Sequence, residues 1–225
     1  WKNKGKIAIK RNILFFFHIW DKMGKGGEKF LKTKNELPKA ELTPRTGSRR
    51  ADWVDREAMG HVLAALMPEN RLAVEIAMST GLRISDVLSI KTEQIRDKKG
   101  NLGGRNRITV RELKTGKNHR VYLPNELLRQ MVMISGKYYV FEGRLSPKKH
   151  RTRQAIAKDL LRARKILRTR NLVVSAHTAR KIWAVEQTRD GKDLKKLQKM
   201  MNHSDPTITM IYAMADEITR KKLGW

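Results

Sequence analysis

The sequence predicts a mainly α-helical fold with one small antiparallel β-sheet. Apolar residues recur at helical spacing over most of the chain beyond residue 55, which indicates helices that pack one face against a core. Residues 107–112 and 118–123 instead alternate or are β-branched, with Lys114-Thr115-Gly116-Lys117 between them, a pattern typical of a β-hairpin. With 225 residues and 40% hydrophobic content, the chain is predicted to form one large domain or one domain plus a fragment.

The N-terminal part of the chain divides into two segments. Residues 1–20 carry an apolar face between Ile13 and Trp20 at near-helical spacing, and the chain starts without Met, so we expect a short helix left from a longer protein. Residues 21–51 combine glycines and prolines with many lysines, which predicts a basic linker. The main domain is then expected to span residues 52–225.

Helical patterns follow one another along this main domain. The first runs from about Asp55 to Leu66, and the second ends at Gly81, a natural helix C-terminus. The third is expected to begin near Ser85, a plausible N-cap. After the hairpin, helical periodicity returns at 126–134, at 156–167, after Ser175, at 194–201 and after Pro206.

Charge and composition restrict the class of partner. The chain has 50 Lys and Arg against 22 Asp and Glu, a net charge of +28, which indicates a polyanion such as DNA or RNA, or less directly an acidic membrane surface. A ribosome-like structural binder is the alternative. Cysteine is absent, which excludes disulfides and Cys nucleophiles. The longest apolar run, Ile13–Trp20, has eight residues, far below the ~20 that span a bilayer.

A second basic feature lies in residues 144–170, which hold eleven Lys or Arg and one acidic residue, Asp159. An apolar stripe from Ile156 to Leu167 predicts one packed helix face, and the opposite face is almost purely cationic. We interpret this segment as a surface that contacts DNA phosphates, with a solvated face as the simple alternative. The candidate residues are Lys148, Lys149, Arg151 and Arg153.

Chemistry-bearing residues occur in four separate segments. Arg83 follows the helix stop at Gly81, and Lys114 occupies the predicted hairpin tip. His177 and Arg180 are three residues apart and therefore share a helical face. His203 precedes a helix start, and Tyr212 follows nine residues later. Each feature alone is more often a surface or core residue than a site residue.

Taken together, their order and spacing resemble the tyrosine recombinase family of phage integrases. Residues 79–90, 114–124, 177–184 and 202–213 match its motifs in order. Asn202 stands where glycine is common, Ala213-Met214 replaces the usual Thr-His, and Ile182 replaces a small hydroxyl residue. None of these departures removes a catalytic group. The resemblance implies the tyrosine recombinase catalytic-domain fold for residues 52–225, a stub of the core-binding domain for 1–20 and the interdomain linker for 21–51.

The resemblance also implies a role for each residue of the set. Arg83 and Arg180 would hold the scissile phosphate, with His203 as a further phosphate donor. Tyr212 would be the nucleophile, His177 its base-like partner, Lys114 the acid that protonates the leaving 5′-oxygen, and Asp86 a supporting residue that orients the site.

These residue types suit metal-free cleavage of DNA. Arginine matches two phosphate oxygens and stays charged, so fixed arginines can stabilise the charge that develops in the transition state. A phenol with an ordinary pKa near ~10 needs a proton acceptor at neutral pH. No carboxylate cluster accompanies the motifs, so we expect no metal and no cofactor.

The expected function is site-specific recombination or integration of a mobile element through a 3′-phosphotyrosyl intermediate. A type IB topoisomerase or telomere resolvase, a non-catalytic DNA-binding module and an RNA-packaging protein are the alternatives. Expected partners are double-stranded recombination sites, a homotetramer on DNA and accessory DNA-bending proteins, with no membrane. We expect a cytoplasmic, nucleoid-associated protein in a bacterial host. The tail, with Met214 and Ile218 on one helical side, is expected to dock on a neighbouring protomer, or alternatively on its own domain.

Overall fold

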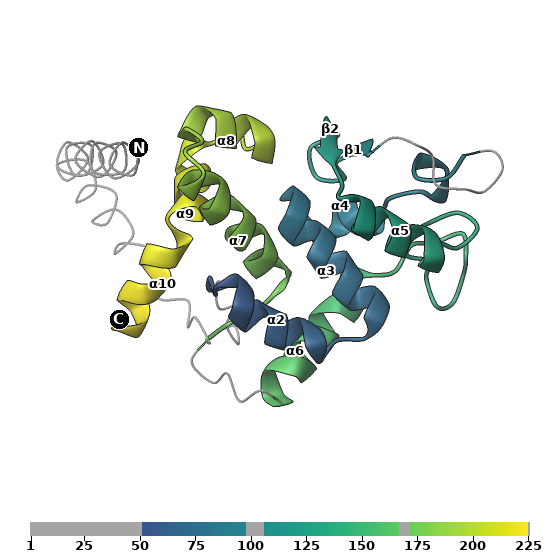
Figure 1. Cartoon of the computed structure of the whole chain (residues 1–225), viewed down its shortest axis with the longest axis horizontal. Helices are drawn as coiled ribbons and strands as arrows, with labels where there is room; N and C mark the ends of the chain where they lie inside the picture. The colour runs from purple at the N-terminus through teal and green to yellow at the C-terminus, as the bar shows by residue number, and fades with distance from the viewer. Residues whose placement is uncertain (1–50, 98–105, 167–171, 225) are drawn as a thin grey trace, which may run out of the picture. The chain divides into compact units, whose positions relative to one another are not determined.

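The computed structural model describes residues 51–97, 106–166 and 172–224. The predicted helix at 1–20 and the predicted linker, apart from Ala51, lie outside the described residues. Within the described part, the chain is mostly helical and contains a two-stranded antiparallel sheet (Figure 1). The fold class predicted from the sequence is therefore confirmed.

The described elements follow the order that the periodicity predicts. They are α2 (Arg56–Ala64), α3 (Pro68–Thr80), α4 (Ile84–Leu88), the 3₁₀ helix η1 (Thr92–Gln94), β1 (Arg107–Arg111), β2 (Asn118–Tyr122), α5 (Asn125–Ile134), α6 (Arg153–Ile166), α7 (Ala176–Arg189), α8 (Leu194–Met201), α9 (Pro206–Ala213) and α10 (Ala215–Leu223).

Two helices far apart in the sequence, α3 and α7, lie side by side at the centre of the domain (Figure 1). On one side, α3 also contacts α4, α5 and α6, and on the other α7 contacts α8, α9 and α10. Ile76 and Ala77 of α3 and Ala179 of α7 are fully buried in the core between these layers. Removing such apolar surface from water is the main stabilising contribution, so α3 and α7 form a rigid support for residues at their ends.

Gly81 permits the close approach of these two helices. It ends α3 with φ 70°, in the left-handed region that favours glycine. A Cβ atom at this position would lie 2.5 Å from the ring of Trp183 on α7. Glycine is therefore required here both for the backbone turn and for the packing, and this turn delivers Arg83 two residues later.

Capping side chains begin α2 and α7, close to where the periodicity predicts the helices to start. Asp55 accepts a hydrogen bond from the backbone N–H of Ala58 at 2.6 Å, and Ser175 accepts one from the N–H of His177 at 3.2 Å. The prediction that Ser85 caps α4 is wrong. The helix begins at Ile84 with Arg83 as its N-cap, because Arg83 already has extended backbone angles directly after the Gly81 turn.

The hairpin forms where the alternation predicts it. Its strands pair with Ile108 opposite Val121 and Val110 opposite His119. Ile108 and Val110 face the core, whereas the residues between them are exposed. The turn that contains Lys114 therefore projects from the edge of the domain next to α4, which also contacts β1.

The C-terminal helix α10 packs on its own domain. The backbone N–H of Trp53 donates to Thr219 Oγ1 at 2.9 Å, and Lys222 forms an ion pair with Asp52 at 2.7 Å. The residues that α10 buries on its own domain are Ala215 and Thr219, whereas Ile218, on the predicted apolar side, stays 45% exposed. The helix ends at Gly224, whose φ of 74° lies in the left-handed region that favours glycine.

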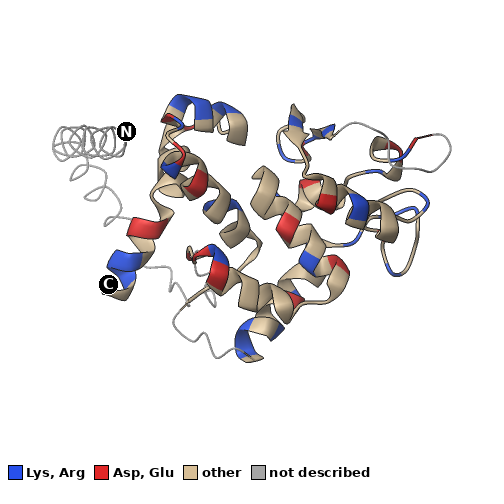
Figure 2. Ribbon diagram, viewed as in Figure 1, with Lys and Arg blue, Asp and Glu red and all other residues tan. Residues whose placement is uncertain are grey.

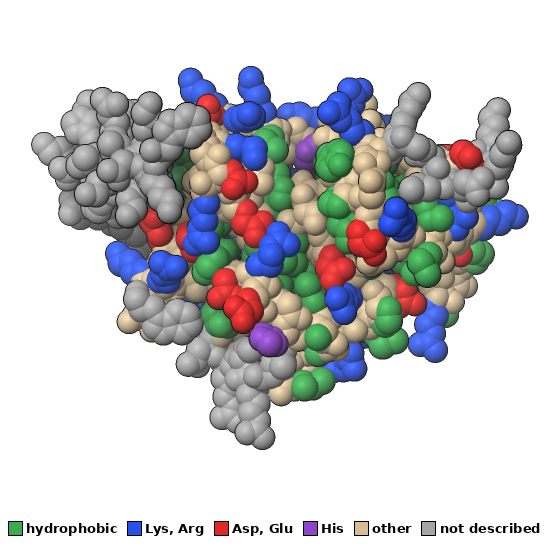
Figure 3. Space-filling view, viewed as in Figure 1, with side chains coloured by type: hydrophobic (Ala, Val, Ile, Leu, Met, Phe, Trp, Pro, Cys, Tyr) green, Lys and Arg blue, Asp and Glu red, His purple; other side chains and the backbone are tan. Residues whose placement is uncertain are grey.

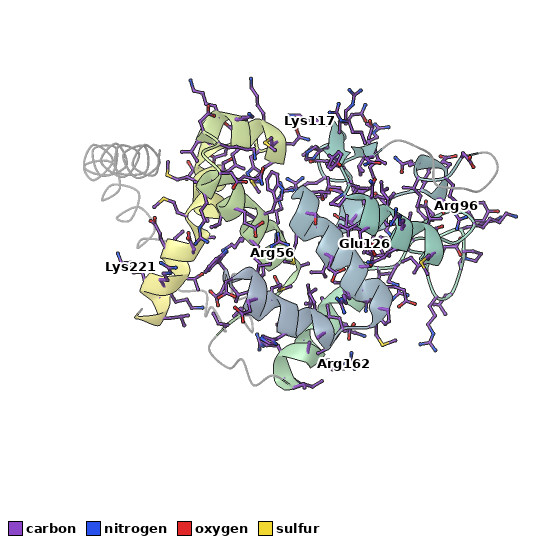
Figure 4. The ribbon with its side chains drawn as sticks, viewed as in Figure 1. Arg56, Arg96, Lys117, Glu126, Arg162 and Lys221 are labelled. Atoms are coloured by element: carbon purple, nitrogen blue, oxygen red, sulfur yellow. The ribbon has the colours of Figure 1, made fainter. Side chains whose placement is uncertain are left out.

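An ion pair between α2 and α7 supports the same arrangement. Arg56, labelled in Figure 4, donates through Nε and Nη2 to the two carboxylate oxygens of Glu186 at 2.8 and 2.7 Å. In the part of the chain that the structure describes, no helix has both the length and the apolar character needed to cross a membrane.

Candidate active site

The centre of the candidate site is Arg180, a buried arginine on α7. It is only 2% exposed, and a buried charge is costly unless it is hydrogen-bonded. Its Nη1 donates to the carbonyl of Gly81, and its Nη2 donates to the carbonyl of Met201 at 2.7 Å and to His203 Nε2 at 3.1 Å. Burial and the nearby Arg83 charge lower the pKa of Arg180 to about 10, so it remains a cation at neutral pH in a fixed orientation.

His203 follows the left-handed C-cap of α8, Asn202, which has φ 51°. Arginine has no acceptor atom, so the contact from Arg180 requires a lone pair on His203 Nε2. The proton then resides on Nδ1, which donates to Thr209 Oγ1 at 3.1 Å. Burial, followed by the charges of Arg180 and Arg83, lowers the pKa of His203 to about 4. His203 is therefore neutral at pH 7 and helps to hold Arg180.

The half-buried Tyr212 lies near the end of α9, with its hydroxyl oxygen 3.0 Å from His177 Nδ1. Burial raises the pKa of the Tyr212 phenol against the opposing effect of Arg180 and Arg83. Burial, then the charges of Arg180 and other basic residues, lowers the pKa of His177. At neutral pH the phenol is thus protonated and donates a hydrogen bond to the neutral imidazole. The candidate nucleophile therefore has a proton acceptor within hydrogen-bond distance.

Arg83 approaches from the turn between α3 and α4, with its side chain 16% exposed. Its Nη1 donates to Glu112 Oε2 at 2.8 Å and lies 4.0 Å from Asp86 Oδ2. Asp86 is fully buried, and its Oδ1 accepts from the backbone N–H of Leu113 at 3.0 Å. Burial raises the pKa of Asp86. The two carboxyl groups thus orient one side of the Arg83 guanidinium.

Lys114 occupies the exposed turn between β1 and β2. Its neighbour Thr115 donates to Glu112 Oε2 at 2.7 Å, which holds the turn beside the site. After burial and the two arginines, the Lys114 charge also lowers the pKa of His203. Lys117, labelled in Figure 4, belongs to the same turn. The hairpin turn therefore supplies an exposed lysine side chain, whereas His177, Arg180 and Tyr212 are carried by helices.

The sequence analysis missed Glu112, which is 1% exposed and lies within hydrogen-bond distance of four side chains around the site. A signal was present in the alternation of the strand. Ile108 and Val110 are the inward-facing residues of β1, and Glu112 continues the same period of two. A charged residue at an inward-facing strand position needs buried partners, so it predicts a polar network.

Basic side chains surround the region where these elements meet. Figure 2 shows Lys and Arg along α8 and on the hairpin. Figure 3 shows a histidine side chain between these two elements, with Lys and Arg side chains on either side. Such a positive rim attracts a polyanion toward the site.

The predicted basic surface contains two kinds of residue. Lys148 and Lys149 are exposed, and Lys148 lines a shallow cavity of about 250 Å³ with two further lysines. Arg151 is half-buried instead and donates to Asn70 Oδ1 at 2.7 Å. Arg153 is exposed at the start of α6, and its charge, after burial and the charges of Arg180, Arg83 and Lys181, lowers the pKa of His177.

The apolar stripe beneath this surface is buried as predicted at Ile156, Leu160 and Ala163, whereas Leu167 lies outside the described residues. Across the described ranges, no group of three or more His, Asp or Glu side chains is placed to hold a metal ion.

Comparison with known proteins gives a consistent family. The model of the phage integrase family matches residues 53–218. The chain is 28% identical over 149 residues to the probable integrase/recombinase YoeC of Bacillus subtilis, covering 64% of this chain and 76% of YoeC. It is 27% identical to the tyrosine recombinase XerA of Pyrococcus furiosus, covering 68% and 52% of the two chains. It is 26% identical to the integrase of Escherichia phage P2, covering 77% and 44%.

Solved structures share the same fold. The XerH site-specific recombinase bound to a palindromic difH substrate superimposes with a TM-score of 0.58 at 17% identity, over 76% of this chain and 51% of that one. The catalytic domain of bacteriophage HP1 integrase has a TM-score of 0.51 at 22% identity, over 73% and 88%. The chain thus spans about half the length of XerA and XerH. Because the family model covers well over half of its residues, the chain belongs to the phage integrase family.

Proposed function

We propose that this chain cleaves and rejoins DNA as a site-specific recombinase, through a covalent bond to Tyr212. The observation that carries the proposal is the 3.0 Å contact between the Tyr212 hydroxyl and a neutral His177, next to the buried cation Arg180. A nucleophile with a base in hydrogen-bond reach and a fixed cation nearby is the arrangement that covalent phosphoryl transfer needs. The names of the relatives, which are integrases and recombinases, do not favour a type IB topoisomerase.

The proposed cleavage step forms one bond and breaks another. The Tyr212 oxygen attacks the phosphorus while its proton passes to His177 Nδ1. Arg83 and Arg180 stabilise the charge on the nonbridging oxygens, and the bond to the 5′-oxygen breaks as Lys114 donates a proton to it. The product is a 3′-phosphotyrosine, which retains a phosphoester bond. A second 5′-hydroxyl can therefore reverse the step without ATP.

His203 needs a change of state to act as the predicted phosphate donor. In the free protein its Nε2 accepts a hydrogen bond from Arg180, and its pKa is about 4. A bound phosphate brings negative charge that offsets the nearby arginines and raises this pKa. We propose that His203 holds Arg180 before DNA binds and donates to the phosphate only when the phosphate is in place.

Double-stranded DNA is the proposed substrate. Two structural relatives are described as bound to DNA, XerH on a difH substrate and a lambda integrase dimer on a core site. In this chain, the exposed side chains of Lys148, Lys149 and Arg153 support phosphate contacts. Arg151, which is bonded to Asn70, supports the segment that carries them. We also propose action in the cytoplasm of a bacterial host, on the DNA of a mobile element.

The assembly and the N-terminal segments extend this proposal. We propose that residues 1–20 complete a core-binding domain and that residues 21–51 track the DNA backbone as a linker. A tetramer on paired sites, with accessory DNA-bending proteins, is the proposed working assembly. Ile218 supports a contact between protomers, because it is an apolar side chain left 45% exposed on a helix already anchored to its own domain.

The test is covalent trapping on a pool of nicked duplexes with randomised cores. A nick near the scissile phosphate lets a short fragment diffuse away, so cleaved DNA stays attached to the protein. We expect attached DNA whose sequences converge, and mass spectrometry should locate the nucleotide on Tyr212. Tyr212→Phe, the matched control, should bind the recovered duplex but attach none. Attachment at Tyr122, Tyr138 or Tyr139, or no attachment at all, would contradict the proposal.

A further inference from the structure

Glu112 is a fully buried carboxylate whose contacts extend well beyond Arg83. One of its oxygens, Oε2, accepts hydrogen bonds from Arg83 Nη1 at 2.8 Å and from Thr115 Oγ1 at 2.7 Å. The other, Oε1, accepts from Asn202 Nδ2 at 3.1 Å and lies 3.2 Å from His119 Nδ1. Both oxygens are thus engaged twice, which uses the full capacity of an ionised carboxylate.

The ionised form of Glu112 is the one that the site stabilises. Burial alone would raise the pKa of Glu112, but hydrogen bonds from Thr115 and Asn202 and the charge of Arg83 outweigh it and lower the pKa. A buried carboxylate is retained only where such partners offset the loss of hydration. The negative charge is therefore present at neutral pH, within hydrogen-bond distance of Arg83.

The partners of Glu112 come from three segments that are far apart in the sequence. Arg83 follows α3, Thr115 is the neighbour of Lys114 in the hairpin turn, and Asn202 directly precedes His203. Asn202 holds the left-handed C-cap of α8, and its side chain spans from this cap to Glu112. One carboxylate thus joins the three segments that supply Arg83, Lys114 and His203 to the site.

We infer that Glu112 is a positioning residue that fixes Arg83, the Lys114 turn and the His203 loop relative to one another before DNA binds. Its effect on cleavage rests on the function proposed above. Groups held in place in advance stabilise a transition state without reorganising during the reaction. The inference also explains why asparagine serves at position 202: glycine would permit the same backbone angles but could not donate to Glu112.

Substitution of Glu112 should slow cleavage more than it weakens DNA binding. Glu112→Gln keeps the shape but loses the charge and one acceptor atom, so it should reduce the single-turnover rate about 10-fold. Glu112→Ala should reduce it about 100-fold, in line with the strength of hydrogen bonds to charged groups. The Kd for the duplex recovered from the trapping experiment should change less than about 3-fold, well below one tenfold step in affinity.

A substrate with sulfur at the 5′-bridging position separates the two routes of action. A thiolate leaves without protonation, so this substrate removes the need for Lys114. We expect Glu112→Ala to regain part of its rate on this substrate, and the remaining defect to report the loosened Arg83. No recovery would contradict the link to the Lys114 turn, and complete recovery would contradict the link to Arg83.

The matched control is Asp52→Asn. Asp52 is also a buried carboxylate, 5% exposed, and it pairs with Lys222 at 2.7 Å away from the site. The Asp52→Asn variant should have a lower thermal stability and an unchanged single-turnover cleavage rate. A rate loss as large as that of Glu112→Gln would mean that loss of stability explains both variants and would overturn the inference.

A measurement without DNA keeps this inference separate from the proposed function. In ¹⁵N-labelled full chain, the Arg83 guanidinium N–H signals, assigned by their loss in Arg83→Lys, should show slow exchange with water. Glu112→Gln should speed this exchange at least about 10-fold, as expected when a hydrogen bond to a charged group is lost. Unchanged exchange overturns the inference even if the enzyme cleaves DNA, whereas a wild-type protein that attaches no DNA overturns the proposed function alone.

Discussion

The domain holds its positive charge in two contrasting ways. Around Tyr212, Arg180 is 2% exposed and makes three hydrogen bonds inside the protein. On the basic surface, Lys148 and Lys149 extend into solvent. Buried and oriented cations can stabilise a transition state, whereas exposed cations contribute affinity by displacing counterions from DNA. The comparison predicts that substitutions around Tyr212 alter the cleavage rate. Substitutions on the basic surface should instead alter the affinity for DNA.

The largest effect is expected at Arg180. Arg180→Lys keeps the charge but cannot reach Gly81, Met201 and His203 at once, because lysine lacks the planar fork. The single-turnover cleavage rate should fall about 10³-fold, the upper range for loss of one transition-state donor, while the Kd for DNA changes little. The cleavage rate and the Kd are both measured with the duplex recovered from the trapping experiment. An equal loss of affinity would remove the distinction between the two regions.

Lys114 should give the next largest effect. It is the one proposed catalytic group on an exposed turn, so its removal leaves the buried network intact. Lys114→Ala should slow cleavage about 10²-fold, the lower range for loss of a general acid, and 5′-bridging sulfur should restore the rate. Lys117→Ala, in the same turn, is the matched control and should retain the rate. Failure of the sulfur substrate to restore Lys114→Ala would exclude Lys114 as the acid.

The pH dependence tests the contact between His177 and Tyr212. Burial and nearby cations lower the pKa of His177 below its ordinary value near 6.5. The imidazole accepts a proton only when it is neutral, so the rate should be constant near pH 7. It should fall about 10-fold per unit once the pH is below the His177 pKa. The same profile in His177→Gln would assign the titration to another group.

Much of the scaffold could be predicted from local patterns. Periodicity located the helices and the hairpin, because apolar residues on one face must be buried in almost any packing of these elements. The helix starts near Asp55 and Ser175 were predicted from the same periodicity, and both side chains cap their helices because such a side chain bonds to backbone only two or three residues away. Ser85 failed as a cap because the helix start depended on the turn at Gly81 rather than on hydroxyl chemistry.

The site was predictable only in part, and the reason is physical. The motif order identified Arg83, His177, Arg180 and Tyr212, but hydrogen-bond partners depend on contacts between distant segments. The contact of Arg180 with Gly81 joins residues 99 positions apart, and Glu112 reaches Asn202 over 90 positions. The requirement for glycine at position 81 also depends on Trp183, which no local pattern reveals.

The basic surface should show the opposite behaviour to the active site. Lys148→Gln with Lys149→Gln should weaken binding to all DNA sequences similarly and reduce the slope of log K against log salt by about 0.9 per lost phosphate contact. The cleavage rate at saturating DNA should stay unchanged. Titrations at several salt concentrations measure the slope. An unchanged slope would show that these lysines form a solvated face.

Arg151 and Arg153 provide the smallest and sharpest test, because they are two residues apart and differ in how they are held. Arg151 donates to Asn70 and lies 3.9 Å from Glu69, with its side chain 25% exposed. Arg153 is exposed at the start of α6.

Arg151→Gln should therefore lower the free energy of unfolding by about 1 kcal/mol, the typical contribution of one hydrogen bond, with little change in the salt slope. Arg153→Gln should do the reverse, because the exposed Arg153 side chain makes no comparable contact in the described part of the chain and is proposed to contact a DNA phosphate. Chemical denaturation and salt titration of both variants measure the two quantities. Both residues are arginines in the same segment. A difference between the two variants in stability or in salt slope therefore reports the difference in burial and hydrogen bonding. If both variants change the salt slope equally, exposure does not determine what a basic residue contributes in this domain.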